Sequence, residues 1–244
     1  PQVTFVENIG QWPDSILFRG EASGNVVWIT ATGWYIELQQ APVPARLGLA
    51  TVADSGQTSP LQRQTADALS ADSSTNESAG QGQLIGVRLE GANIHPEIVY
   101  GDKLPFTTNL FFGSDSSKWR HHIPMYSTIN LLNIYNGIDL RFYGRDGQME
   151  YDFLVSPGSD PSAIKIVFSG QECLDTTANG DLLVAGILDT VVQLKPVAFQ
   201  LVGNQRESRD IHFVITEGGR VSFEFDNEID LTKPVVIDPV ITFS

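Results

Sequence analysis

The chain has 244 residues, of which 41% are hydrophobic, and 29 acidic against 15 basic residues give it a formal net charge of -14. This charge repels phosphate backbones and anionic membrane surfaces, and no basic run offsets it, so nucleic acid is excluded as an expected partner. No stretch approaches the roughly 18 apolar residues of a membrane helix, so membrane insertion is not expected either.

Short strands separated by turns dominate the sequence. Alternating or β-branched runs predict the strands, and Asn-Gly, Asp-Gly and Gly-Gly pairs at short intervals predict the turns. Helical periodicity is almost absent, apart from single turns expected at 114–119 and 160–163. This pattern is typical of an all-β, antiparallel, sandwich-like fold. The predicted strands are 26–30, 33–38, 85–89, 164–168, 182–184, 197–201, 211–215, 221–225 and 235–237.

One segment interrupts the strands. Residues 51–83 are rich in Ser, Thr, Ala, Gln and Gly and contain no aromatic residue. Such a composition buries too little apolar surface to offset the entropy of ordering, so we expect a long flexible insert. We therefore predict two packed lobes, an N-terminal β lobe over 1–122 that carries the insert and a C-terminal β lobe over 123–244.

An Asp-Gly pair, Asp146 and Gly147, lies between two alternating runs and predicts the tip of a hairpin, because a type I′ turn needs positive φ at both central residues. The apolar residues then share one face and the charged residues the other. We interpret the charged face as solvated, with one cross-strand ion pair. The predicted pairs are Leu140 with Phe153, Arg141 with Asp152, Phe142 with Tyr151 and Tyr143 with Glu150.

Two sets of carboxylates suggest alternative chemistry. Glu150 and Asp152 are two residues apart on one strand face, about 7 Å, which suits an inverting glycosidase. Asp226, Glu228 and Asp230 also alternate, and calcium prefers several oxygen ligands, although their spacing is not that of an EF-hand. A solvated strand face explains both sets without any function.

Histidine and cysteine give little support for a metal or a nucleophile. His121 and His122 are expected to point to opposite faces of a strand, so zinc at His121 is not expected. Cys173 is the single cysteine, which excludes an intramolecular disulfide, and its acidic neighbours are unfavourable for a reactive thiolate. We predict a structural role for Cys173, and no cofactor other than the alternative of calcium.

Aromatic residues with polar neighbours are the remaining candidates for ligand binding. Flat rings stack on the apolar faces of sugars, and adjacent polar groups bond the hydroxyls. Trp12 and Trp119 lie in turn-like contexts, and Arg120 follows Trp119 directly. With Tyr143 they form the candidate set for binding a polysaccharide, although most rings of a β protein belong to its core.

Six motifs follow one another along the chain. They are FVENIGQW at 5–12, LPFTTNLFFG at 104–113 with SKWR at 117–120, YNGIDLRFY at 135–143, EYDF at 150–153, PGSDP at 157–161 and PVVIDPV at 234–240. In this order they resemble the N-terminal domain of large bacterial cell-surface proteins, in which that domain precedes SBBP-type β-propeller repeats or other extracellular modules and a gliding-motility-type sorting region. The resemblance covers nearly the whole chain except 51–83, where a shorter link is expected.

The resemblance implies an exported protein on the outer surface of a bacterium, and it implies no catalytic residues. We therefore expect a non-catalytic, adhesin-like structural module of a surface protein, which contacts neighbouring domains of a longer precursor or copies of itself. The alternatives are a carbohydrate-binding module and a glycoside hydrolase that uses Glu150 and Asp152.

Overall fold

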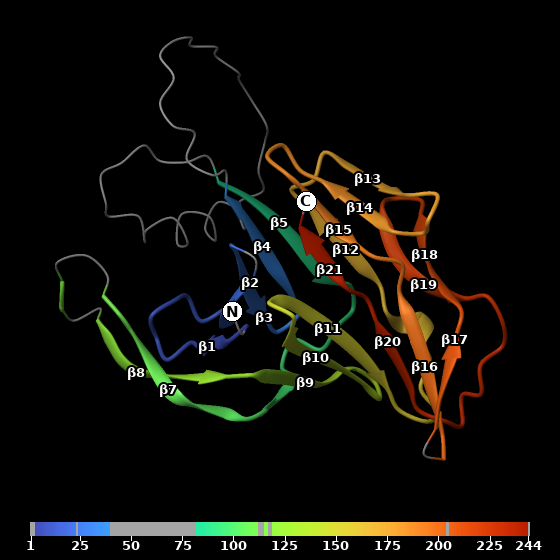
Figure 1. Ribbon diagram of the computed structural model, residues 1–244, viewed down its shortest axis with the longest axis horizontal. Coiled ribbons are helices and arrows are strands. Elements are labelled where there is room, and N and C mark those ends of the chain that lie inside the picture. Colours follow the sequence, from blue (N-terminus) through green and yellow to red (C-terminus); the bar gives the residue numbers. More distant parts are fainter. Residues whose placement is uncertain are drawn as a thin grey trace, which may run out of the picture.

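The computed structural model describes residues 3–22, 24–39, 82–111, 115–116, 119–203 and 205–243 (Figure 1). Its strands form three sheets, and every pairing between neighbouring strands is antiparallel. Within these ranges, no helix is long and apolar enough to cross a membrane. The predicted all-β, antiparallel, sandwich-like fold is confirmed.

The largest sheet, sheet A, has ten strands in the order β18-β19-β12-β5-β4-β3-β2-β1-β8-β7. Its strands are β1 (Phe5–Glu7), β2 (Ile16–Ala22), β3 (Asn25–Thr30), β4 (Gly33–Gln39), β5 (Gly82–Leu89), β7 (Lys103–Leu110), β8 (Arg120–Tyr126), β12 (Ile166–Ser169), β18 (Ile211–Thr216) and β19 (Arg220–Phe225).

Sheet B has the order β17-β16-β20-β11-β10-β9-β6, and sheet C has the order β13-β14-β15-β21. Sheet B comprises β6 (Glu97–Tyr100), β9 (Thr128–Tyr135), β10 (Ile138–Arg145), β11 (Gln148–Val155), β16 (Val197–Val202), β17 (Gln205–Arg209) and β20 (Val235–Asp238). Sheet C comprises β13 (Cys173–Thr176), β14 (Leu182–Ala185), β15 (Thr190–Gln193) and β21 (Ile241–Phe243), and one 3-10 turn, η3, covers Pro161–Ala163.

Sheets A and B pack face to face through aromatic side chains. Trp34 on β4 lies with its ring centroid 5.4 Å from that of Phe142 on β10 and 4.6 Å from that of Tyr151 on β11. All three rings are buried, and such pairs contribute about 0.5–1.5 kcal/mol beyond their buried area. Sheet C joins the same core, because the Tyr151 hydroxyl donates to Gln193 Oε1 on β15 at 2.9 Å.

The expected division into lobes at residue 122 is wrong, because both large sheets cross it. In sheet A, β12 pairs with β5, and in sheet B, β6 pairs with β9. One buried cluster also contains residues from both halves, from Val3 to Ile241. Strands from distant parts of the sequence therefore share one core.

The predicted insert falls almost entirely outside the described residues. Its last two positions, Gly82 and Gln83, are an exception, since they begin β5. Gln83 is also bound in place, because its Nε2 donates to the Gly170 carbonyl at 2.7 Å and its Oε1 accepts from the Ile187 amide at 2.7 Å. The expected boundary at residue 83 is therefore wrong by two residues.

The predicted hairpin over 140–155 is confirmed in every pair. Leu140 is opposite Phe153, Arg141 opposite Asp152, Phe142 opposite Tyr151 and Tyr143 opposite Glu150. Asp146 and Gly147 form the tip with φ of 52° and 81°. The turn at 160–163 is confirmed as well, and Asp160 Oδ1 accepts from the Ser162 amide at 2.9 Å.

A long two-stranded ribbon connects sheets A and B. The strands β6 and β7 follow each other along one side of it, and β9 and β8 lie opposite them. The Gly101 amide donates to the Thr128 carbonyl at 2.9 Å where the ribbon passes from one sheet to the other. In Figure 1 the part formed by β7 and β8 projects to the lower left, away from the body of the molecule.

Candidate functional site

The loop between β1 and β2 is organised by one side chain, that of Asn8. Its Oδ1 accepts from the amides of Gly10 and Trp12 at 3.0 and 3.2 Å. Its Nδ2 donates to the carbonyls of Trp12, Pro13 and Ile16 at 3.2, 3.0 and 2.7 Å. A short amide side chain can satisfy many loop groups at once, so the motif at 5–12 encodes a rigid loop.

Trp12 belongs to the core, which corrects the expectation of an exposed ring. Its side chain is 9% exposed, and its ring meets that of Trp28 edge to face at 5.3 Å. Trp12 does lie in a loop, as predicted. The hydrogen bonds of Asn8 hold this loop in a shape that turns Trp12 inward. Its ring is therefore not available as a platform for a sugar.

A second cluster, between β1 and the ribbon, was not predicted. Glu7 on β1 accepts a hydrogen bond from the Tyr100 hydroxyl at Oε1 (3.1 Å) and from the Tyr126 hydroxyl at Oε2 (3.2 Å). Burial, followed by the bond to Glu7, raises the pKa of Tyr100 to about 12, so its hydroxyl stays a donor. These bonds tie sheet A to β6 at the edge of sheet B.

The charged face of the hairpin is a buried ion network, not the solvated face that we expected. Glu150 and Asp152 are only 4% and 1% exposed. Asp152 Oδ2 bonds the guanidinium of Arg141, and its Oδ1 accepts from the Tyr143 hydroxyl at 3.0 Å. Arg145 Nη1 lies 3.1 Å from Glu150 Oε2.

The carboxylates are shielded from solvent because the longer arginine side chains beside them cover them. Both guanidiniums lie against the Tyr143 ring, with Cζ at 5.1 Å for Arg141 and 5.5 Å for Arg145, and both arginines stay partly exposed. The backbone of Glu150 also forms an isolated antiparallel β-bridge with Val240. The partly buried Tyr143 ring thus packs against two guanidiniums, which leaves less of it for stacking on a sugar.

Asp238, on β20, joins this network from the neighbouring strand. Its Oδ2 lies 3.9 Å from Arg145 Nη1. Burial, and then the charges of Asp152 and Glu150, raise the pKa of Asp238 to about 6. Three carboxylates therefore face two arginines. The arrangement keeps these carboxylates buried on the face of sheet B. Neither Glu150 nor Asp152 is therefore accessible to a sugar ring.

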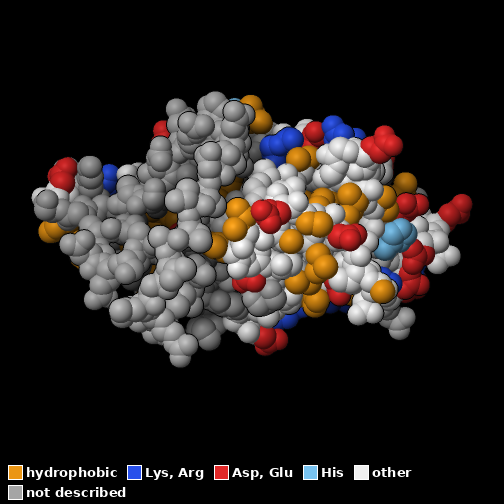
Figure 2. Space-filling view, turned by 90° about the horizontal axis from the view of Figure 1, so that it is seen from above, with side chains coloured by type: hydrophobic (Ala, Val, Ile, Leu, Met, Phe, Trp, Pro, Cys, Tyr) orange, Lys and Arg blue, Asp and Glu red, His pale blue; other side chains and the backbone are white. Residues whose placement is uncertain are grey.

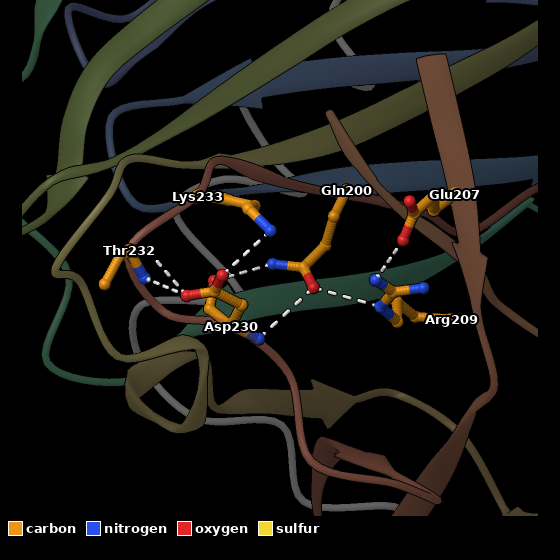
Figure 3. Close-up of polar contacts among 6 residues, drawn as sticks. All are labelled: Gln200, Glu207, Arg209, Asp230, Thr232 and Lys233. Atoms are coloured by element: carbon orange, nitrogen blue, oxygen red, sulfur yellow. Dashed lines mark hydrogen bonds and ion pairs between the residues drawn. The ribbon is translucent and has the colours of Figure 1, made fainter. Parts of the chain in front are cut away.

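The acidic residues after β19 are separated by their partners. Asp226 Oδ1 lies 2.6 Å from His212 Nδ1 on β18. Asp230 Oδ2 lies 2.9 Å from Lys233 Nζ, and Oδ1 accepts from the Thr232 amide at 3.0 Å, as Figure 3 shows. Lys233 and Thr232 together lower the pKa of Asp230 to about 2, the bond from the Thr232 hydroxyl being the largest cause.

The backbone of Asp230 is fixed to β16 as well. The buried amide of Gln200 donates to the Asp230 carbonyl at 2.8 Å and accepts from its amide at 3.2 Å, while Arg209 Nε donates to Gln200 Oε1 (Figure 3). Residues 226–230 do not form a strand, so the side chains of Asp226, Glu228 and Asp230 do not share one strand face as the sequence pattern predicted. Among the described residues, no group of three or more potential metal ligands comes together.

The remaining candidates lie at the outer end of the ribbon. The Phe111 ring is 5.3 Å from the Trp119 ring and 5.3 Å from the His121 ring. Arg120 donates to the carbonyls of Trp119 and Gly10 at 3.1 Å each. Only part of the turn expected at 114–119 is described, and there the Trp119 amide donates to the Ser116 carbonyl.

Two further expectations concern single residues. His122 has φ of 56°, so the strict alternation assumed for it and His121 breaks down, and their rings are 6.5 Å apart. Cys173 begins the edge strand β13 and is exposed. Neither residue lies in the ion network or beside Glu7.

Comparisons with known proteins give one result. The model of a family described as a domain of unknown function (DUF7948) matches residues 5–240. The searches of curated proteins and of solved structures gave no significant match. Since the match spans nearly all of the chain, this protein belongs to the DUF7948 family.

Proposed function

We propose that the chain is a non-catalytic module of a bacterial surface protein, and that it contacts other polypeptides through the ribbon. One observation carries the proposal. The strand β7 has eight residues and lies at one edge of sheet A among the described strands, yet none of its residues is buried. A long exposed edge strand is a template for pairing and packing with another chain, and natural proteins normally shorten or cover it.

Apolar side chains on the same ribbon support this role. Four large hydrophobic residues between 99 and 111 are exposed, and Phe106 and Phe111 are 50% and 57% exposed. A group of exposed apolar side chains in a soluble domain marks an interaction surface. The neighbouring domains of a longer protein, or copies of this chain, are the partners that the resemblance at 5–12 and 234–240 favours.

Cysteine labelling tests the contact and the location. In a Cys173→Ser background, Phe106→Cys and the control Glu217→Cys are introduced into the full natural protein and treated with a membrane-impermeant maleimide. On intact cells we expect labelling of position 217 and protection of position 106, whereas both react in the purified 244-residue chain. Equal labelling of the two positions on cells contradicts the contact. Labelling only after lysis contradicts an outer-surface location.

A carbohydrate-binding module is the second candidate, favoured by the Phe111 and Trp119 rings at the end of the ribbon. Stacking on these rings would hold a sugar, and Arg120 would lie beside it. A glycan array with the wild type and Trp119→Ala tests this role. Specific binding that Trp119→Ala removes without lowering Tm supports the carbohydrate-binding role. An array on which no glycan is bound contradicts it.

A further inference from the structure

The cluster around Glu7 lines a hollow at the open edge of sheet B. The hollow has a volume of about 190 Å³ and is open to solvent. Its walls come from β1, the following loop, β2 and β6. The side chains that matter are the carboxylates of Glu7 and Asp14, the ring of Tyr100, and the apolar groups of Phe18 and Ile98.

The two carboxylates of the hollow have no cationic partner within the described chain. Neither Glu7 nor Asp14 forms an ion pair there. Each oxygen of Glu7 accepts one phenol hydrogen bond, and a carboxylate oxygen has two acceptor positions. One position on each oxygen is therefore left for a further donor.

These walls suit a cation on an apolar stem. An apolar ligand would take water from the carboxylates and give no bond in return. A lysine or arginine side chain instead packs its stem on the partly buried Ile98, brings its charge to the carboxylates, and lies beside the half-exposed Tyr100 ring. The whole chain, at a net charge of -14, also attracts basic partners. In Figure 2, acidic side chains are spread over the part of this face that is not grey.

The neighbouring strand edge indicates a polypeptide as the source of this side chain. Sheet B ends at β6, whose only partner among the described strands is β9. An extended peptide can add to such an edge by main-chain hydrogen bonds and place alternate side chains in nearby pockets. We propose that an extended basic segment of a partner protein adds to β6 and inserts a lysine or arginine into the hollow. This inference rests on the proposed function.

Peptide binding followed by NMR tests the proposal with the 244-residue chain. The probe is a capped hexapeptide of alternating threonine and lysine, and the matched control has norleucine, which keeps the stem without the charge. We expect the lysine peptide to shift the amides of Gly10, Leu17 and Tyr100, and to bind about tenfold more tightly than the control at low salt.

Variants separate the hollow from the general acidity of the surface. Asp14→Asn and Glu7→Gln should each weaken binding of the lysine peptide about three- to fivefold, while Glu217→Gln, a distant exposed carboxylate, leaves it unchanged. Equal binding of the two peptides, equal effects of all three variants, or shifts elsewhere overturn the proposal. Shifts produced at these amides by a glucosamine tetramer and not by the peptide also overturn it. Protection of position 106 on cells together with any of these failures leaves the proposed function standing.

Discussion

Arg141 and Asp152 lie opposite each other on β10 and β11 and form an ion pair of unequal exposure. The side chain of Asp152 is 2% exposed, whereas that of Arg141 is 38% exposed. The arginine thus covers the carboxylate that it neutralises. A pair of this kind is more important for how the face packs than for the net free energy of folding.

Removing the arginine alone should destabilise the protein strongly. Arg141→Met leaves a buried carboxylate with only the Tyr143 hydroxyl as donor, and we expect a loss of about 3 kcal/mol in the free energy of unfolding. The double variant Arg141→Met/Asp152→Leu should recover most of this loss. Urea unfolding of both variants is the measurement, and a single-variant loss no larger than that of an exposed pair contradicts this account.

Asp238 should make stability depend on pH. Its pKa is raised from an ordinary 3.8 to about 6 in the folded state, so its contribution is fully present below pH 3.8 and is lost as pH rises through 6. Asp238→Asn should therefore be more stable than the wild type at pH 7.5, by at most about 3 kcal/mol, with the difference shrinking towards pH 4. Thermal unfolding across this range measures the difference, and a pH-independent difference would argue against a buried ionised Asp238.

Asn8→Ala should loosen the loop between β1 and β2. Five hydrogen bonds end on this side chain, and we expect a loss of about 3 kcal/mol, with a red shift of tryptophan fluorescence as Trp12 becomes wetter. Asn179→Ala is the control, since Asn179 is an exposed turn residue. If the two variants had equal Tm values, Asn8 would not organise the loop.

Calcium should leave Tm unchanged. The charge of Asp230 is neutralised by Lys233, and Asp226 is held by His212, so a cation would have to break both contacts. Differential scanning calorimetry with calcium and with a chelator checks this expectation. A calcium-dependent rise in Tm that Asp230→Asn abolishes would contradict this expectation and support a calcium site at Asp230.

The hairpin over 140–155 was predictable because its pattern is local. The Asp146-Gly147 turn fixes the register, and strict alternation assigns each side chain to a face. The strand β9 was not predicted, and there the alternation fails: Asn133 has φ of 51°, and Ile134 and Tyr135 are both buried. A bulge of this kind hides the period of two on which the prediction depends.

The candidate sites were harder to predict, because their parts come from distant strands. Alternation placed Glu150 and Asp152 correctly on one face, but it does not tell whether solvent or arginine covers that face. Asp238 reaches the network through the pairing of β20 with β11, and Glu7 meets Tyr100 through the packing of β1 against β6. The local sequence pattern does not show that Asp238 lies beside the ion network or that Glu7 lies beside Tyr100.

Photo-cross-linking from the ribbon tests the central claim most directly. Phe106 is replaced by the aromatic photo-cross-linker benzoylphenylalanine in the full natural protein, and Glu217 is replaced in the same way as a control. After irradiation of intact cells, we expect a discrete cross-linked polypeptide product from position 106 and none from position 217. No product from position 106, or the same products from both positions, would contradict the role of the ribbon as a contact surface.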